Sequence, residues 1–208
     1  MLQIIMTAMG IGLVFNAAPG AVFTESLRRG VRGGFRPAFA VQVGSLTGDA
    51  VWAILGLSGV AALFLLPSVQ IPLTVVGCLI LAGLGALGIR DALAGDRSAV
   101  PAEARGGRSS AVLTGAGMSL GNPWNIVYWA GAAGAVAGML GKQPEPRHLV
   151  AFFAGFMVSS LLWCFVCAGM IAGLRRALKP TAIRAIEAMS GVALLAFAAL
   201  LLIRLFSS

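Results

Sequence analysis

The chain has 208 residues, of which 59% are hydrophobic and only 11% are charged, and its mean hydropathy is +0.94. A soluble core needs no such excess of apolar residues, so the composition argues against a soluble domain and indicates a polytopic membrane protein. The formal net charge of +8 would suggest nucleic acid as a partner of a soluble protein, but here Lys and Arg fall between apolar segments and rarely among aromatic residues. The positive charge is therefore a signal of membrane topology, and no nucleic-acid partner is expected.

Six runs of the sequence are apolar for about the 20 residues that a membrane-spanning helix needs. The first, which begins MLQIIMTAMGIGLVF, has no Lys or Arg ahead of it and no cleavage pattern after it, so it is predicted to be a retained span and not a signal peptide. A tight turn is predicted at PSVQIP (67–72), between the second and third runs. The runs are roughly Leu2–Ser26, Pro37–Leu66, Val69–Ile89, Val112–Leu140, Leu149–Leu174 and Ala182–Phe206.

A polar segment at Arg90–Ser110, rich in Gly, Ser, Ala and charge, divides the chain near its middle and predicts a linker. We expect one membrane domain made of a first three-helix half (1–90), a cytoplasmic linker (91–110) and a second three-helix half (111–208). Because each half has an odd number of spans, a second half that repeats the first must be inverted in the membrane, as in secondary transporters. The predicted fold class is an all-α polytopic membrane protein with six transmembrane helices in two inverted repeats.

The opening span of each half is interrupted, by NAAPG (16–20) in the first and by LGNPWN (120–125) in the second. Proline frees backbone carbonyls that lipid cannot satisfy, so such a break must face protein or a watery cavity. A single proline is most often only a kink, but two breaks at corresponding places favour a functional interpretation.

The second break has the residues that begin a helix. Asn122 suits the N-cap position and Pro123 the first helical position, which would direct the positive end of a half-helix into the bundle to hold a carboxylate. Asn16, Pro19 and Gly20 would form the inverted counterpart. These residues are predicted to bind substrate.

Asp49, in GSLTGDAVWAILGL, is the acid expected near the middle of the bilayer, because it follows Arg36 by about 20 Å of helix. An intramembrane carboxylate is costly and marks a substrate site, an ion site or a proton relay, so Asp49 is predicted to bind substrate and to couple transport to protons or ions. The alternatives are a protonated Asp49 that hydrogen-bonds a neighbouring helix, and a position nearer the interface. The other acids are expected in loops, at helix ends or in the opening turns of the last span: Glu25, Asp91, Asp96, Glu103, Glu145 and Glu187.

Gly44 and Gly48 lie four residues apart just before Asp49. This small-xxx-small spacing allows close contact between helices. We expect it to bring the Asp49 helix against another backbone, such as one of the broken helices.

The basic residues orient the bundle. Segments 27–36, 90–110 and 175–184 contain most of the Lys and Arg residues, so these loops are predicted to be cytoplasmic and both termini to face outward. The opposite side has Lys142 and Arg147 in its loops, with Arg204 close to the C-terminus.

Cys164 and Cys167 form a C-x-x-C motif inside an uninterrupted apolar run. With no cation or break nearby to activate a thiol, the expected role of this pair is packing, and a membrane thiol/disulfide electron carrier is the alternative. Cys78 is also in an apolar run, and His148 is the only histidine, so no metal site and no cofactor are predicted. The sequence has no nucleophile with partners, no P-loop and no dinucleotide fingerprint, so an enzyme is not expected.

Two stretches resemble the LysE-type (LysE/RhtB) amino-acid exporter family: NAAPGAVFTESLRRGVRGGFRPAFAVQVGSLTGDAVWAIL in the first half and GNPWNIVYWAG in the second. Pro19, Gly20, Asp49, Asn122 and Pro123 match the family's characteristic positions. Ala21 and Trp124 stand where the family commonly has Pro and Lys, and Glu25 is unusual beside SLRRG. The first half also resembles a divergent branch of the family that is associated with chemosensory gene clusters.

The resemblance implies a six-span bacterial inner-membrane protein that forms a homodimer and exports amino acids or related small zwitterions with an ion or proton gradient. A non-transporting membrane component of a signalling system is a further alternative.

Overall fold

The computed structural model describes the backbone of residues 1–17, 20–58, 67–94, 107–122, 125, 128–129 and 145–207. These residues are almost entirely helical, and no strand occurs among them. The helices are α1 (Leu2–Ala17), α2 (Ala21–Gly33), α3 (Phe35–Leu57), α4 (Pro67–Ala94), α5 (Gly107–Leu120), α7 (Pro146–Ala177) and α8 (Pro180–Ser207).

The first apolar run is interrupted as NAAPG predicts. α1 ends at Ala17 and α2 begins at Ala21, and their axes are bent by 64°. Asn16 belongs to the last turn of α1, and Gly20 is the N-cap residue of α2. Pro19 lies outside the described residues, so its predicted role is not visible here.

The predicted loop at 27–36 is wrong. α2 continues to Gly33 and α3 begins at Phe35, so the arginines of this segment lie on helices. Only Gly34 separates the two helices, and its φ of 79° is in the region that favours glycine. Its N–H donates to the carbonyl of Gly30 at 2.7 Å, which satisfies one of the last carbonyls of α2.

The tight turn predicted at PSVQIP is also wrong. Pro67 begins α4, where a missing N–H costs nothing, and Pro72 lies inside the helix. α4 then continues past Ile89 to Ala94, into the segment expected to be a linker, and α5 begins at Gly107. The division into two halves is not tested by these helices, since residues 95–106 lie outside the described part of the chain.

Three of the described helices are long and apolar enough to cross a membrane: α3, α7 and α8 over Pro180–Ile203. α1 and α2 together make a fourth candidate if the bent pair is one span. α4 has a shorter apolar stretch, Thr74–Arg90. Of the predicted run Val112–Leu140, the structure describes α5 and a few residues after it. The chain is thus a helical, multi-pass protein, and the count of six spans stays a prediction.

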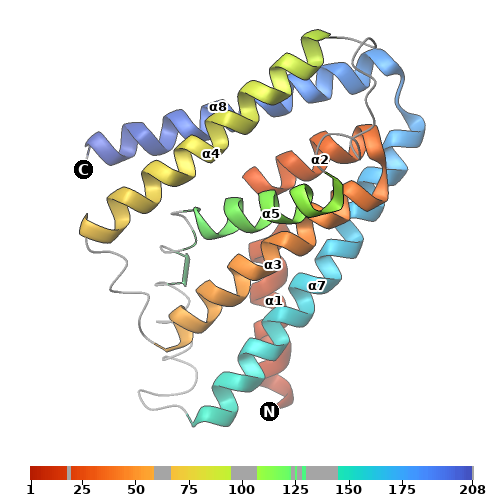
Figure 1. Cartoon of the computed structure of the whole chain (residues 1–208). Coiled ribbons are helices and arrows are strands. Elements are labelled where there is room, and N and C mark those ends of the chain that lie inside the picture. Colours follow the sequence, from red (N-terminus) through yellow and green to blue (C-terminus); the bar gives the residue numbers. More distant parts are fainter. Residues whose placement is uncertain are drawn as a thin grey trace.

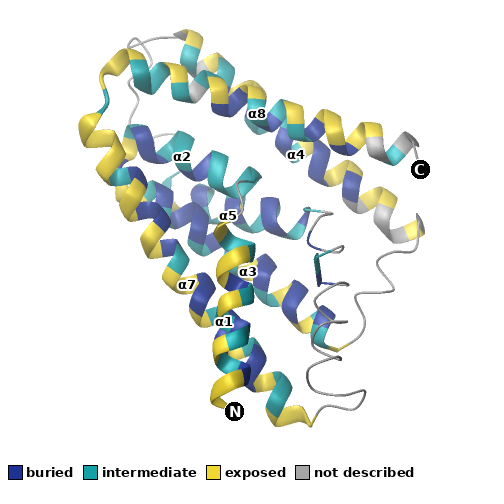
Figure 2. Ribbon diagram, turned by 180° about the vertical axis from the view of Figure 1, so that it is seen from behind, coloured by how far each residue is buried: buried dark blue, intermediate teal, exposed yellow. Residues whose placement is uncertain are grey.

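The helices form two layers that α2 connects. α4 and α8 run side by side as one layer, and α3 and α7 are neighbours in the other, where α1 packs on α7 and α5 on α3 (Figure 1). α2 contacts α3 and α7 on one side and α8 on the other. Figure 2 shows buried and half-buried residues along most of α3, while α7 and α8 expose much of their outward faces.

Glycines allow the closest helix contacts, as the spacing of Gly44 and Gly48 predicts. A side-chain carbon at Gly44 would collide with the carbonyl oxygen of Val112, and one at Gly48 would collide with Ser119. Gly115 of α5 meets the carbonyl of Val41 in the same way. The expectation is confirmed: α3 lies directly against α5, the helix that leads into the second break.

Candidate functional site

A cavity of about 580 Å³ lies where the two breaks approach each other. It is lined by residues of α1, α2, α3, α4, α5 and α8, together with Asn125 and Tyr128. Four of the six predicted site residues line it: Asn16, Gly20, Asp49 and Asn122. The other two, Pro19 and Pro123, lie outside the described residues.

Asp49 is the charged residue among the described residues of the cavity wall, and it is only 3% exposed. Its Oδ1 atom accepts a hydrogen bond of 3.0 Å from the hydroxyl of Ser119. Its Oδ2 atom is buried and has no hydrogen-bond partner in the described part of the chain. A buried polar atom without a partner is costly, so a ligand or a proton at Oδ2 would lower the free energy of the site.

A polar network holds the second break against Asp49. Nδ2 of Asn125 donates to the carbonyl of Ser119 at 2.9 Å, and the indole N–H of Trp52 donates to the same carbonyl at 3.2 Å. Nδ2 of Asn122 donates to Oδ1 of Asn125 at 3.3 Å. The carbonyl of Ser119, in the last turn of α5, is thereby satisfied inside the protein, as a helix end at membrane depth requires.

The Asn122 carbonyl accepts from the N–H of Asn125 at 3.0 Å, and Asn125 is helical. The predicted N-cap by the Asn122 side chain remains a prediction, since Pro123 and the residue after it are not described.

α2 begins at the cavity without a side-chain cap. Its N-cap residue, Gly20, has extended backbone and, as a glycine, has no side chain that could cap the first turn. The Gly20 carbonyl accepts from both the N–H and the hydroxyl of Thr24, each at 2.9 Å. The first N–H groups of a helix have no partner within the helix, so Ala21, Val22 and Phe23 bring a positive helix end to the cavity wall.

Asn16 faces the same cavity but is engaged with the protein. Its Nδ2 atom donates to the carbonyl of Gly12 at 2.7 Å and to the hydroxyl of Ser160 at 2.8 Å. This amide therefore ties the end of α1 to α7, and its oxygen is the part of the side chain that these two bonds do not use.

The rest of the wall is apolar or aromatic. Phe15 and Tyr128 lie with their ring centroids 4.3 Å apart, and the Tyr128 hydroxyl donates to the carbonyl of Ile11 at 3.2 Å. The layer of α4 and α8 contributes one apolar wall, made of Leu81, Phe197 and Leu201. The cavity thus combines one carboxylate, several neutral polar groups and a large apolar surface.

The cysteine pair lies outside the described lining of the cavity. Cys164 and Cys167 are free thiols and both are buried. The Cys164 thiol donates to the carbonyl of Ser160 at 3.2 Å, and Cys167 accepts from Nε2 of Gln42 at 3.3 Å. These contacts are those of thiols that pack between helices, as the apolar setting of the motif predicts. The described residues also contain no group of three His, Cys, Asp or Glu that could hold a metal ion.

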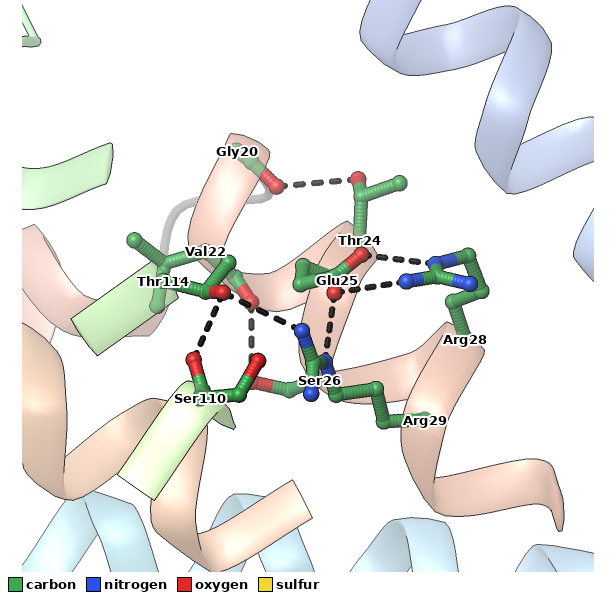
Figure 3. A network of polar contacts seen from close by, with 9 residues as sticks. All are labelled: Gly20, Val22, Thr24, Glu25, Ser26, Arg28, Arg29, Ser110 and Thr114. Atoms are coloured by element: carbon green, nitrogen blue, oxygen red, sulfur yellow. Dashed lines mark hydrogen bonds and ion pairs between the residues drawn. The ribbon is translucent and has the colours of Figure 1, made fainter. Parts of the chain in front are cut away.

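Glu25 was expected in a loop or at a helix end, and this expectation is wrong. It lies inside α2 and is fully buried, with 0% exposure. Its two oxygens accept from Nε of Arg28 at 2.7 Å and Nε of Arg29 at 2.6 Å, and Arg29 also donates to the hydroxyl of Thr114 at 3.1 Å (Figure 3). The negative charge is paired within α2 because α2 continues where a loop was predicted, and Arg29 links that helix to α5.

Sequence reasoning missed several residues of the cavity wall. Ser45 and Gln42 lie on the same side of α3 as Asp49, at helical spacing of four and seven residues, which was an available signal. Ser119 precedes the LGNPWN motif and Asn125 is its last residue, but their role depends on how α5 packs on α3. Tyr128 reaches the cavity only because of its contact with α1.

Comparisons with known proteins place the chain in a family. The family model described as "LysE type translocator" matches residues 13–205. The "Chemotactic transduction protein ChpE" of Pseudomonas aeruginosa is 48% identical over 202 residues, which cover 97% of this chain and 98% of that protein. The "Putative amino acid efflux protein YcgF" of Bacillus subtilis is 25% identical over 199 residues, or 94% of this chain and 93% of that one.

No solved structure matches the chain significantly. The family match runs from the end of α1 to the end of α8 and so includes both breaks and Asp49. The chain therefore belongs to the LysE type translocator family.

Proposed function

We propose that this protein is a secondary transporter that exports amino acids or related small zwitterionic solutes across the bacterial inner membrane, coupled to a proton or ion gradient. One observation supports the proposal: the cavity wall contains Asp49, whose Oδ2 atom has no partner among the described residues, and the N-terminus of α2, whose N-cap residue is a glycine. A zwitterion has a positive and a negative group, so its site needs a negative partner such as a carboxylate and a positive partner such as a helix N-terminus.

The chemistry of the two groups is complementary to an amino acid. An ammonium group would donate to Oδ2 of Asp49 while Ser119 keeps Oδ1 occupied, since charge-assisted hydrogen bonds of this kind are the strong ones. The carboxylate would accept from the first N–H groups of α2, where the helix dipole favours negative charge. Asn16, Asn122 and the two prolines, Pro19 and Pro123, would shape the breaks that hold these groups in place.

Asp49 is also the proposed coupling group. A buried carboxylate that binds an ammonium in one state must release it and be neutralised in another, because an empty buried charge is costly. A proton or a small cation at Oδ2 would serve in the return step. The flux of substrate would then be linked to the opposite flux of that ion.

Repeated contacts support the two inverted halves and rocking between them. The segments GSLTGDAVW (44–52) and GFMVSSLLW (155–163) have Gly, a small residue and Trp at the same spacings. Gly44 of α3 meets the Val112 carbonyl of α5, and Gly155 of α7 meets the Ile5 carbonyl of α1 in the same manner. In this alignment α3 corresponds to α7 and α5 to α1.

The polar contacts follow the same correspondence. Ser119 of α5 donates to Asp49, and Asn16 of α1 donates to Ser160, which stands at the position in the second segment that Asp49 has in the first. The carboxylate is thus present in one half only. Alternating access by rocking of the halves would expose this one charged site to each side in turn.

The basic segments support the orientation. The helix ends that contain the basic segments lie toward one end of the bundle (Figure 1). They are the C-terminal ends of α2, α4 and α7 and the N-terminal ends of α5 and α8. A side-chain carbon at Gly34 would lie 3.1 Å from Nη1 of Arg175, so two of the basic segments meet there. By the positive-inside rule, segments 27–36, 90–110 and 175–184 would be cytoplasmic and both termini external. A homodimer in the membrane is also part of this proposal.

The second candidate is a non-transporting membrane component of a signalling system. The 48% identity to a protein named for chemotactic transduction favours it, as do Ala21 and Trp124 at positions where the family commonly has Pro and Lys. This candidate predicts no solute flux and a defect in a sensory response when the protein is removed. The efflux name of the second relative favours transport.

Efflux from cells separates the two candidates. Cells that lack amino-acid exporters are given dipeptides, and the amino acids that leave the cell are measured with the wild-type protein, with Asp49→Asn and with Glu145→Gln. Glu145 is the matched control, because it is an exposed acid paired with Arg147 at 2.6 Å, away from the cavity. The proposal predicts efflux with the wild type and the control and its loss with Asp49→Asn; equal efflux in all cells, with or without the protein, would favour the signalling role.

A further inference from the structure

The cavity wall that lies away from Asp49 is apolar. It is made of Leu81 from α4 and of Phe197 and Leu201 from α8. These residues belong to a larger apolar cluster in which Leu194 is fully buried, and Ala21 and Val22 at the start of α2 pack against it. The wall is therefore a continuous apolar surface next to the helix end that would hold a carboxylate.

The described lining offers no second charge. Asp49 is the single ionisable acid or base among the lining residues apart from the phenol of Tyr128. Its free oxygen is used by the ammonium group in the proposed function, and the neutral polar groups of Ser119 and Asn125 are already paired with each other or with Asp49. A charged side chain on the substrate would find no second counter-charge among the described lining residues, and an uncompensated charge against an apolar wall is costly.

We infer that Leu81, Phe197 and Leu201 form the side-chain subsite, and that the substrates are amino acids with uncharged, apolar side chains. This inference rests on the proposed function and adds the substrate class to it. Burial of the substrate's aliphatic or aromatic side chain against these three residues supplies binding energy in proportion to the area removed from water. The volume of about 580 Å³ leaves room for side chains as large as that of phenylalanine.

The test uses the purified full-length protein in proteoliposomes. Exchange of labelled leucine is measured against unlabelled leucine, phenylalanine, lysine and glutamate, and a half-saturation concentration is obtained for each. Leucine and phenylalanine are expected to compete at concentrations at least about tenfold lower than lysine and glutamate, the size of effect that pocket complementarity gives.

Two variants locate the subsite. Leu201→Ala and Phe197→Ala enlarge it, so each is expected to change the ratio of the leucine and phenylalanine half-saturation concentrations about tenfold in favour of phenylalanine. Leu200→Ala is the matched control. Leu200 immediately precedes Leu201 in α8, is 56% exposed and is not among the lining residues of the cavity. The ratio does not depend on how much of each variant folds.

The outcomes separate this inference from the proposed function. Competition by lysine as strong as by leucine would overturn the apolar subsite and leave amino-acid transport standing. A ratio that changes equally in Leu200→Ala and in the subsite variants would also overturn it. If none of the amino acids is exchanged, the proposed function fails, and the inference fails with it.

Discussion

The hydroxyl of Ser119 in α5 donates a hydrogen bond of 3.0 Å to Oδ1 of Asp49 in α3, while Oδ2 of the same carboxylate has no partner among the described residues. One oxygen is thus fixed by the helix that leads into the second break, and the residue itself lines the cavity. The contact joins the two features that the sequence singles out, a broken helix and an intramembrane acid. Ser119 therefore sets the orientation of the carboxylate.

Replacement of Ser119 by Ala is expected to weaken substrate binding. Loss of a hydrogen bond to a charged group costs about 1.5–3 kcal/mol, so the half-saturation concentration for transport should rise tenfold or more. Transport kinetics in proteoliposomes measure this. Ser109→Ala is the control, because Ser109 is exposed on the same helix. Unchanged kinetics in Ser119→Ala would show that the contact does not orient Asp49 for binding.

Replacement of Gly44 by Ala is expected to destabilise the fold. The added carbon would collide with the Val112 carbonyl, a backbone atom that cannot move without shifting α5, and overpacking of this kind costs about 1–3 kcal/mol. Thermal unfolding of the purified protein in detergent gives the change. Gly169→Ala is the matched control in α7, where an added carbon meets nothing within 4 Å. Equal unfolding temperatures for the two variants would contradict the close α3–α5 contact.

Replacement of Glu25 by Gln is expected to be strongly destabilising. Glu25 is fully buried and accepts hydrogen bonds from two arginines. Removal of one partner from a buried ion pair costs about 3–5 kcal/mol. The same unfolding measurement applies. Glu145→Gln removes an acid whose side chain is 58% exposed, and exposed pairs contribute only about 0–1 kcal/mol. Equal stability of the two variants would mean that the Glu25 cluster does not hold α2 in place.

The orientation can be tested with single added cysteines. The native cysteines Cys78, Cys164 and Cys167 are all buried, so a membrane-impermeant thiol reagent should label them little. Arg36→Cys and Arg147→Cys both place a thiol at an exposed position. In intact cells, labelling is expected at position 147 and not at position 36, and inside-out vesicles should give the opposite pattern. The reverse result would invert the proposed topology.

Some of the architecture follows directly from the sequence. The break between α1 and α2 is predicted by the adjacent pair Pro19 and Gly20, since a proline next to a glycine favours the end of a helix. The contact of α3 with α5 is predicted by the spacing of Gly44 and Gly48. Asp49 stands out because a carboxylate in an apolar run has few structural uses.

Other features depend on tertiary contacts that no local pattern encodes. Arginines at 28, 29 and 32 are typical of a cytoplasmic loop, but here α2 continues through them. Glu25 and Thr114 accept from the side chains of Arg28 and Arg29, and these contacts hold the helix in place. Pro67 and Pro72 suggest a turn, yet α4 includes both, since a proline at the first position costs nothing and one inside a membrane helix is tolerated. Asn125 and Tyr128 belong to the cavity only through bonds to α5 and α1.

The most direct test of the account is exchange of labelled leucine in proteoliposomes that contain either the wild-type protein or the Asp49→Asn variant, with Glu145→Gln as the control. The wild type and the control are expected to exchange leucine, and Asp49→Asn is expected to lose at least about tenfold in rate, because a neutral amide cannot form the charge-assisted bond to the ammonium group. Exchange by Asp49→Asn at the wild-type rate would contradict the claim that this carboxylate is the centre of the transport site.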